Sequence, residues 1–347
     1  IVDSIFVSKI SEDALSAVSL AFPVQNLMIA IASGTGVGIN AYLSRSLGEN
    51  NRKNANRSAT HGIVLAFLSS LLFVIFGLFF VRLFFESQSA ENQAIVEYGI
   101  EYLEVCSILS LGLFGQVTFE RLLQSTGKTF YAMITQGLGA VINLILDPIL
   151  IFGYLGFPEM GVSGAALATV IGQFFAAALA IYFNITKNKE LNLSFKRFVL
   201  HFKTIKIIYS VGIPSILMVS ISSIMTFGLN KILIDFSSTA VAVLGVYFKL
   251  QSFVFMPIFG LNNGMIPIVA YNYGSLDPER IKKTIKLAVT YAISIMIVGF
   301  LIFQIFTEPL LRLFEASDEM IAIGIPALRV ISLCFIPAGF CIIIVSV

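Results

Sequence analysis

Long apolar stretches separated by short polar segments follow one another along the whole chain. Each is continuous and close to the ~20 residues that an α-helix needs to cross the ~30 Å hydrocarbon core of a membrane. The stretches do not alternate over ~10 residues as the strands of a membrane β-barrel do, so helices are predicted. The segments lie at about 1–8, 14–44, 59–83, 94–119, 130–152, 162–186, 205–234, 240–272, 287–307 and 320–347.

The composition agrees with a multi-pass membrane protein. Of 347 residues, 57% are hydrophobic and only 12% are charged, against about 25% charged in soluble domains. The formal net charge of +2 gives no electrostatic basis for nucleic-acid binding. The three cysteines and two histidines have neither disulfide-framework nor zinc-ligand spacing, so no cofactor is expected.

Basic residues mark one side of the membrane. Alternate loops, beginning with the loop near residue 50, hold 16 Lys and Arg residues, whereas the loops between them hold four. Positive charge gathers on the cytoplasmic side of membrane proteins. We therefore expect a multi-pass protein of the plasma (inner) membrane whose N-terminus is cytoplasmic.

An internal repeat relates the two halves of the chain without a gap in the alignment. Gln25 aligns with Gln251, and at the same offset the glycines at 34, 38 and 48 align with those at 260, 264 and 274. Six predicted helices separate the copies. Because six is even, the copies have the same orientation, as in transporters built from parallel repeats. The predicted fold is all-α, with two like-oriented six-helix bundles.

The repeat also predicts the domain organisation. We expect an N-terminal lobe at 1–186, a basic cytoplasmic linker at 187–204 and a C-terminal lobe at 205–347. The run LSFKRFVLHFKTI in and after the linker is typical of an amphipathic interfacial helix. Two full copies would need about twelve helices, so we expect the chain to lack part of its first helix and its last two.

Polar residues inside the apolar segments are costly and are functional candidates. Asn143 and Asp147 are four residues apart in NLILDP, so they share one helix face, and Pro148 removes a backbone hydrogen bond beside them. Carboxylate and carbonyl oxygens suit a hard cation such as Na⁺, and a desolvated carboxyl can instead carry a proton. The alternative is an interhelical hydrogen-bond clamp. Asp3 is a second carboxylate in an apolar segment, and Thr169 could add a hydroxyl oxygen.

A second polar set occupies matching helices of the two copies and predicts the walls of a substrate cavity. Lys249 is the clearest member, with snorkelling to the membrane surface as its alternative. The full set is Gln25, Asn40, Lys249, Gln251, Asn262 and Asn263.

Several segments together resemble the multidrug and toxic compound extrusion (MATE) family. They include VDSIFVS, ALSAVSLAFPV, LSRSLGENNRKNA, LLQSTGKTFYAM, NLILDPILIFG, GVSGAALATVIGQ, GIPSIL and GLNNGMIPIVAYNYG. The resemblance implies twelve helices around a central cavity and export of drug-like, often cationic, compounds in exchange for Na⁺ or H⁺. It also implies a cation site at Asp3, Asn143, Asp147 and Thr169. Ser222 stands where some members have a further acidic residue.

These observations predict a cation-coupled antiporter that works as a monomer in the lipid bilayer, with small organic cations or other lipophilic drugs as its partners. A flippase for lipid-linked precursors is the nearest alternative, although it would need a more basic cavity. A membrane-embedded enzyme is less favoured, because no Asp-rich magnesium motif or catalytic constellation is present.

Overall fold

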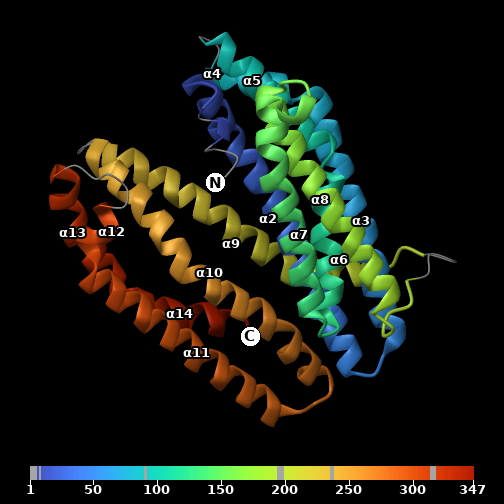
Figure 1. The fold of residues 1–347 in the computed structure, drawn as a ribbon. Coiled ribbons are helices and arrows are strands. Elements are labelled where there is room, and N and C mark those ends of the chain that lie inside the picture. Colours follow the sequence, from blue (N-terminus) through green and yellow to red (C-terminus); the bar gives the residue numbers. More distant parts are fainter. Residues whose placement is uncertain (1–5, 8, 90–91, 194–198, 235–237, 313–317) are drawn as a thin grey trace. The chain divides into compact units, whose positions relative to one another are not determined.

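The computed structural model describes residues 6–7, 9–89, 92–193, 199–234, 238–312 and 318–347 (Figure 1). Throughout these residues the regular structure is helical and contains no strand, which confirms the all-α prediction. The predicted first segment, residues 1–8, lies almost entirely outside the described residues, and Asp3 lies outside them with it.

The helices of the first copy are α2 (Glu12–Gly48), α3 (Arg52–Phe79), α4 (Val81–Ser89), α5 (Gln93–Ile108), α6 (Leu111–Ser125), α7 (Thr129–Phe152) and α8 (Gly161–Thr186). A short 3₁₀ turn, η1 (Tyr154–Gly156), follows α7. The helices of the second copy are α9 (Phe202–Ile234), α10 (Ser238–Gly274), α11 (Pro278–Ile305), α12 (Thr307–Arg312), α13 (Asp318–Ser332) and α14 (Phe335–Val345).

Among the described residues, seven helices are long and apolar enough to cross a membrane, and nine spans result if two bent pairs count as one span each. These nine correspond to the nine predicted segments after the first. The pairs are α5 with α6 and α13 with α14, and each is bent by 44°. The sequence predicted each pair as one uninterrupted segment, because its apolar run continues across the break.

The internal repeat is reproduced by the helix boundaries. At the offset that aligns Gln25 with Gln251, both ends of α2 coincide with both ends of α10, and both ends of α3 coincide with those of α11. Almost the same offset relates the starts of α5 and α13, at Gln93 and Asp318, and the matching bends follow them. The repeat that was weak in sequence identity is therefore strong in local structure.

The loop before α3 and the loop before α11 also share their capping. Asn51 Oδ1 accepts a hydrogen bond from the backbone N–H of Asn54, and Asp277 Oδ1 accepts one from that of Arg280. The residue before each cap is left-handed: Asn50 has φ +57° and Leu276 has φ +58°. Asparagine tolerates this conformation, whereas leucine is strained by about 1–2 kcal/mol.

We expect Leu276→Asn to stabilise the protein by about 1 kcal/mol, because it relieves that strain. The Leu276 side chain is 86% exposed, so little packing is lost. Thermal unfolding in detergent measures the gain. Leu276→Ala is the matched control: it removes the same side chain but keeps a residue that disfavours positive φ, so an equal gain there would contradict this explanation.

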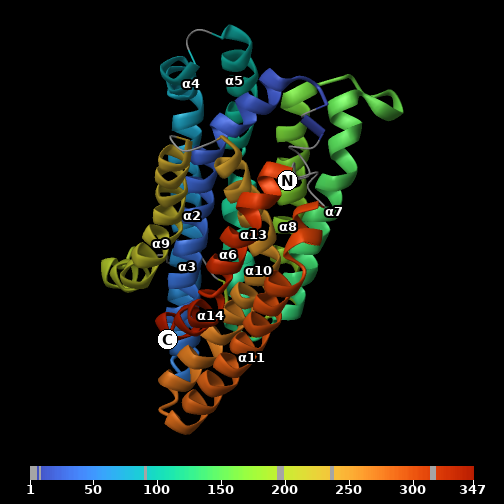
Figure 2. The same ribbon diagram turned by 90° about the vertical axis from the view of Figure 1, so that its left-hand side faces the viewer.

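The described residues group into two compact units, residues 1–47 with 51–220 and residues 48–50 with 221–347. In the first unit α8 packs on α5, α6 and α7, and α3 packs on α5 and α6. α4 and the beginning of α5 pack together at one end of this unit (Figure 2). In the second unit α11 packs on α10, α13 and α14. The beginning of α9 belongs to the first unit, and the predicted lobe boundary at 187–204 remains a prediction.

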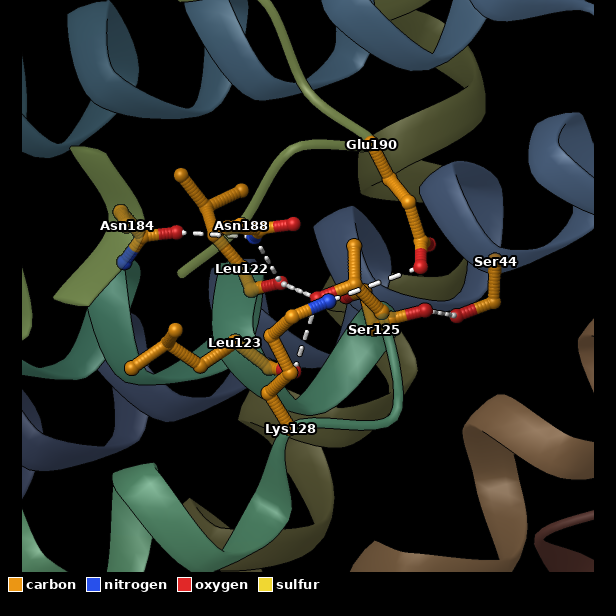
Figure 3. Close-up of polar contacts among 9 residues, drawn as sticks. Ser44, Leu122, Leu123, Ser125, Lys128, Asn184, Asn188 and Glu190 are labelled. Atoms are coloured by element: carbon orange, nitrogen blue, oxygen red, sulfur yellow. Dashed lines mark hydrogen bonds and ion pairs between the residues drawn. The ribbon is translucent and has the colours of Figure 1, made fainter. Parts of the chain in front are cut away.

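The beginning of the predicted linker is fastened to the first unit rather than extended (Figure 3). Asn188 is buried, and its Nδ2 donates to the carbonyl of Leu122 at 3.4 Å. Glu190 Oε1 lies 3.5 Å from Nζ of Lys128, a residue of the turn between α6 and α7. Leu191 is buried among residues of α2, α3 and α6. Of the run predicted as an interfacial helix, residues 194–198 lie outside the described part and residues 199–201 are not helical.

Candidate functional site

Asn143, Asp147 and Thr169 meet between α7 and α8. Asn143 Nδ2 donates to Asp147 Oδ1 at 3.2 Å and to Thr169 Oγ1 at 3.2 Å. An amide has two N–H donors, so Asn143 can make both bonds at once and join the two helices. Asp147 is fully buried. The structure thus brings together the three described members of the predicted cation site.

Glycines on both helices make this meeting possible. A Cβ at Gly172 would lie 2.6 Å from the carbonyl oxygen of Gly139, and one at Gly164 would lie 2.6 Å from that of Leu150. These close approaches occur on either side of the Asn143–Thr169 contact along the helices. Small residues let membrane helices approach closely, which brings the short polar side chains between them within hydrogen-bonding distance.

Pro148 leaves one carbonyl near the cluster without its helical hydrogen bond. α7 continues through this proline to Phe152, but proline has no N–H and cannot bond to the carbonyl of Leu144, four residues earlier. A buried carboxyl, a hydroxyl, an amide and a backbone carbonyl therefore gather within about one turn of α7 and the facing turn of α8. Such oxygen-rich sets suit hard cations.

A cavity of about 190 Å³ opens beside the cluster within the first unit. Thr169 lines it, together with Gln25, Tyr102, Cys106 and Gln173 among others. Gln25 Nε2 donates to Tyr102 Oη at 3.1 Å. Thr169 therefore belongs both to the cluster around Asp147 and to the wall of this cavity, and Gln25 lies in the same wall.

The other predicted cavity residues lie elsewhere. Asn40 is fully buried, and its Oδ1 accepts hydrogen bonds from the hydroxyls of Ser44 and Ser125, so it does not line this cavity. Lys249, Gln251, Asn262 and Asn263 all lie on α10. Lys249 is exposed, and the other three are partly buried. Their role as cavity residues stays a prediction.

Sequence reasoning missed four polar residues that the structure singles out. Gln173 is four residues after Thr169 and shares its face, a spacing that could have revealed it. Tyr102 was hidden among the apolar residues of its segment. Glu120 and its neighbour Arg121 were placed at or beyond the end of a predicted helix, with Arg121 counted as a loop cation. Both are instead buried on α6, which continues to Ser125.

Comparison with known proteins gives consistent matches over most of the chain. The MatE family model matches residues 1–149 and 214–347. An "FAD transporter" of Shewanella oneidensis is 27% identical over 92% of this chain and 70% of its own length. A "Probable multidrug resistance protein NorM" of Thermotoga maritima is 28% identical over 95% of this chain and 71% of its own.

Solved structures agree with the sequence comparison. An outward-facing multidrug resistance MATE family transporter of the MOP superfamily superposes with a TM-score of 0.93 at 26% identity, over 99% of this chain and 76% of that one. A MOP superfamily transporter of Pyrococcus furiosus, described as having a binding pocket of reverse polarity, gives 0.91 at 26% identity, with the same coverage. The family match, the helical membrane fold and these relatives show that the chain belongs to the MatE family of membrane transporters.

Proposed function

We propose that this protein is an alternating-access antiporter that exports drug-like, mostly cationic organic compounds in exchange for Na⁺ or H⁺. The observation that carries the proposal is the buried cluster of Asp147, Asn143 and Thr169, which shares Thr169 with a cavity. Occupation of the cluster and occupation of the cavity therefore act on the same pair of helices. Reciprocal coupling between two ligands requires such a shared element.

The cluster supports either coupling ion. A proton would neutralise the fully buried Asp147 carboxyl, removing the cost of an ionised group away from water. Na⁺ would take oxygen ligands from Asp147 and Thr169, and a half-turn of the Asn143 amide would replace its N–H donors by its carbonyl oxygen. Na⁺ would rearrange the hydrogen bonds of Asn143, and a proton would weaken the one to Asp147 by removing its charge, so either ion changes how α7 is held against α8.

The cavity supports an organic cargo. Its wall combines the apolar side chains of Met28, Ile29, Leu113 and Val170 with a few polar groups, as small-molecule sites do. Its volume of about 190 Å³ is below the ~300–1000 Å³ typical of drug-sized ligands. Only part of a drug-sized cargo would therefore fit into it, and the cavity serves as one subsite of a larger site. Tyr102 is the aromatic residue in this wall, and aromatic rings attract cations.

The charge distribution supports the proposed membrane setting. Without the buried Arg121, the predicted 16 to 4 division of Lys and Arg between alternate loops becomes 15 to 4, which still supports the inner membrane with a cytoplasmic N-terminus. With this orientation, the cytoplasm is the side from which cargo is taken and the opposite side is where it is released.

Efflux from lipid vesicles tests the proposal. The protein is reconstituted, a fluorescent organic cation is loaded, and Na⁺ or H⁺ gradients are imposed one at a time. We expect efflux that depends on one gradient and stops when that gradient is collapsed with an ionophore. Efflux that is indifferent to both gradients would exclude an antiporter driven by either ion.

A flavin nucleotide is the second candidate cargo, favoured by the similarity to the FAD transporter of Shewanella oneidensis. Two exposed basic side chains, Lys249 and Arg329, lie on α10 and α13 of the second unit and suit an anionic group. Unlabelled FAD added to the same vesicles distinguishes the candidates. If FAD is itself transported and the organic cation is not, the cargo assignment above is wrong.

A further inference from the structure

A second buried carboxyl lies in the first unit, outside the cluster around Asp147. Glu120 on α6 is only 7% exposed. Its Oε1 is 3.1 Å from Gln116 Nε2, which donates to it, and 3.1 Å from the hydroxyl of Thr135 on α7. Thr135 is fully buried. A carboxyl inside a membrane span is costly unless it has a role.

The hydrogens around Thr135 favour a neutral Glu120. Thr135 has a single hydroxyl hydrogen, and its Oγ1 is 2.7 Å from the carbonyl oxygen of Ala132 as well as 3.1 Å from Glu120. Both oxygens lie at hydrogen-bonding distance from the Thr135 hydroxyl, but a carboxylate and a carbonyl cannot both accept its one hydrogen. A protonated Glu120 can donate to Thr135 while Thr135 donates to Ala132, so both short contacts are satisfied.

The charges near Glu120 are few. Arg121 adjoins it and acts on it electrostatically, but Arg121 Nη1 donates to Gln124 Oε1 at 2.9 Å. α8 has no charged residue, and the one charge on α7 is Asp147, twelve residues or about 18 Å from Thr135 along the helix. α3, which also packs on α6, carries its titratable side chains near its beginning, at Arg52, Lys53, Arg57 and His61.

From this geometry we propose that Glu120 is a proton-binding group, separate from Asp147, which is neutral in this conformation and releases its proton when α7 moves away from α6. The inference rests on the proposed ion-coupled transport for its role, but not for the protonation itself. The proton passes from the Glu120 carboxyl to a water molecule that reaches it. The carboxylate is then hydrated, and Thr135 moves away with α7 while it still donates to the carbonyl of Ala132 on the same helix.

The consequence for transport follows from the position of Thr135. Thr135 lies on the same helix as Asn143 and Asp147, so the bond between Glu120 and Thr135 holds the helix that carries the cation site. If the proton were lost while α6 and α7 stayed together, the single Thr135 hydrogen could serve only one of the two short contacts. The other contact would hold two oxygens close together with no hydrogen between them, which is unfavourable. Proton release therefore favours a different packing of α6 and α7.

Infrared spectroscopy of the reconstituted protein tests the protonation directly. We expect neutral carboxylic-acid C=O absorption at neutral pH that shifts in heavy water, and one component of it should be missing in Glu120→Gln. Glu104→Gln is the matched control, because it removes one partly exposed carboxyl from α5 of the same unit; it should leave the band in place. An unchanged band in Glu120→Gln would overturn the proposal.

Transport measured against pH tests the role. When one essential group titrates, the transport rate changes by about tenfold per pH unit on one side of its pKa. We expect Glu120→Gln to lose this pH dependence, whereas Glu104→Gln should keep it. Gradient-driven efflux in Glu120→Gln with the wild-type pH profile would exclude the role.

Thr135→Val covers the case in which Glu120→Gln does not fold. This variant keeps the Glu120 carboxyl but removes the hydroxyl that it contacts. The carboxylic-acid C=O band should therefore move to higher frequency, and the midpoint of the pH dependence of transport should shift. An unmoved band would contradict the Glu120–Thr135 bond. If wild-type efflux ignores both gradients, the antiporter proposal fails, whereas the infrared result still decides whether Glu120 is protonated.

Discussion

Asp147→Asn is expected to reduce gradient-driven efflux by about 5- to 150-fold, the range that a coupling free energy of about 1–3 kcal/mol produces. The substitution removes the only acidic group of the described cluster, and with it the binding of a proton or the negative charge that attracts Na⁺. The new amide can still accept a hydrogen bond from Asn143 Nδ2, which now donates to Asp147 at 3.2 Å. The fold should therefore survive while coupling is lost.

Vesicle efflux of a fluorescent cation measures this loss, with Glu101→Gln as the control. Glu101 is an exposed carboxylate on α5 of the same unit, so its removal changes net charge equally without touching the cluster. Wild-type rates in Asp147→Asn under the same gradient would contradict a coupling role for Asp147.

Ion binding can also be followed without transport. If the coupling ion is Na⁺, a concentration of about 100 times Kd should raise the free energy of unfolding by about 2.7 kcal/mol in the wild type. The same addition should have little effect on Asp147→Asn. Equal stabilisation of both proteins would place the Na⁺ site elsewhere.

Gly38→Ala is expected to destabilise the protein by about 1–3 kcal/mol, the usual cost of overpacking. A Cβ at Gly38 would lie 2.1 Å from the carbonyl oxygen of Ile208 on α9. The obstacle is backbone, so it cannot rotate away as the end of a flexible side chain could. The two helices would have to separate at this crossing, where Gly34 and Gly212 also approach closely.

Gly264→Ala provides a control within the same chain. Gly264 occupies the position of Gly38 in the second copy of the repeat, and a Cβ there would meet no atom within 4 Å. Alanine is favoured over glycine in a helix by about 1 kcal/mol, so this variant should be as stable as the wild type or slightly more stable. Thermal unfolding compares the two. Equal losses in both variants would show that the α2–α9 crossing is not the cause.

The pair also shows what a sequence motif can and cannot predict. The glycines of GTGVG at 34–38 have a spacing typical of closely packed membrane helices, and Gly34, Gly36 and Gly38 all have close neighbours in the structure. The equivalent glycines at 260 and 264 have the same spacing but face open space. Spacing on one helix indicates that close packing is allowed, but it does not identify the neighbour.

The amino-acid sequence by itself determined the helical membrane fold, nine of the spans, the internal repeat and the shared face of Asn143 and Asp147. These features depend on hydropathy and on the period of a single helix, both of which are local. The capping of α3 and α11 follows from local sequence in the same way, since Asn51 and Asp277 each bond within three residues.

Only the tertiary structure decided which polar groups meet. The hydrogen bond of Asn143 to Thr169 joins residues 26 positions apart, and that of Gln25 to Tyr102 joins residues 77 apart. The sequence placed Glu120 just beyond the end of a predicted helix, whereas in the structure it is buried against Thr135 of α7. Such contacts depend on the register and the separation of neighbouring helices. Small residues on both helices set these together, so the sequence of one helix alone does not predict which polar groups meet.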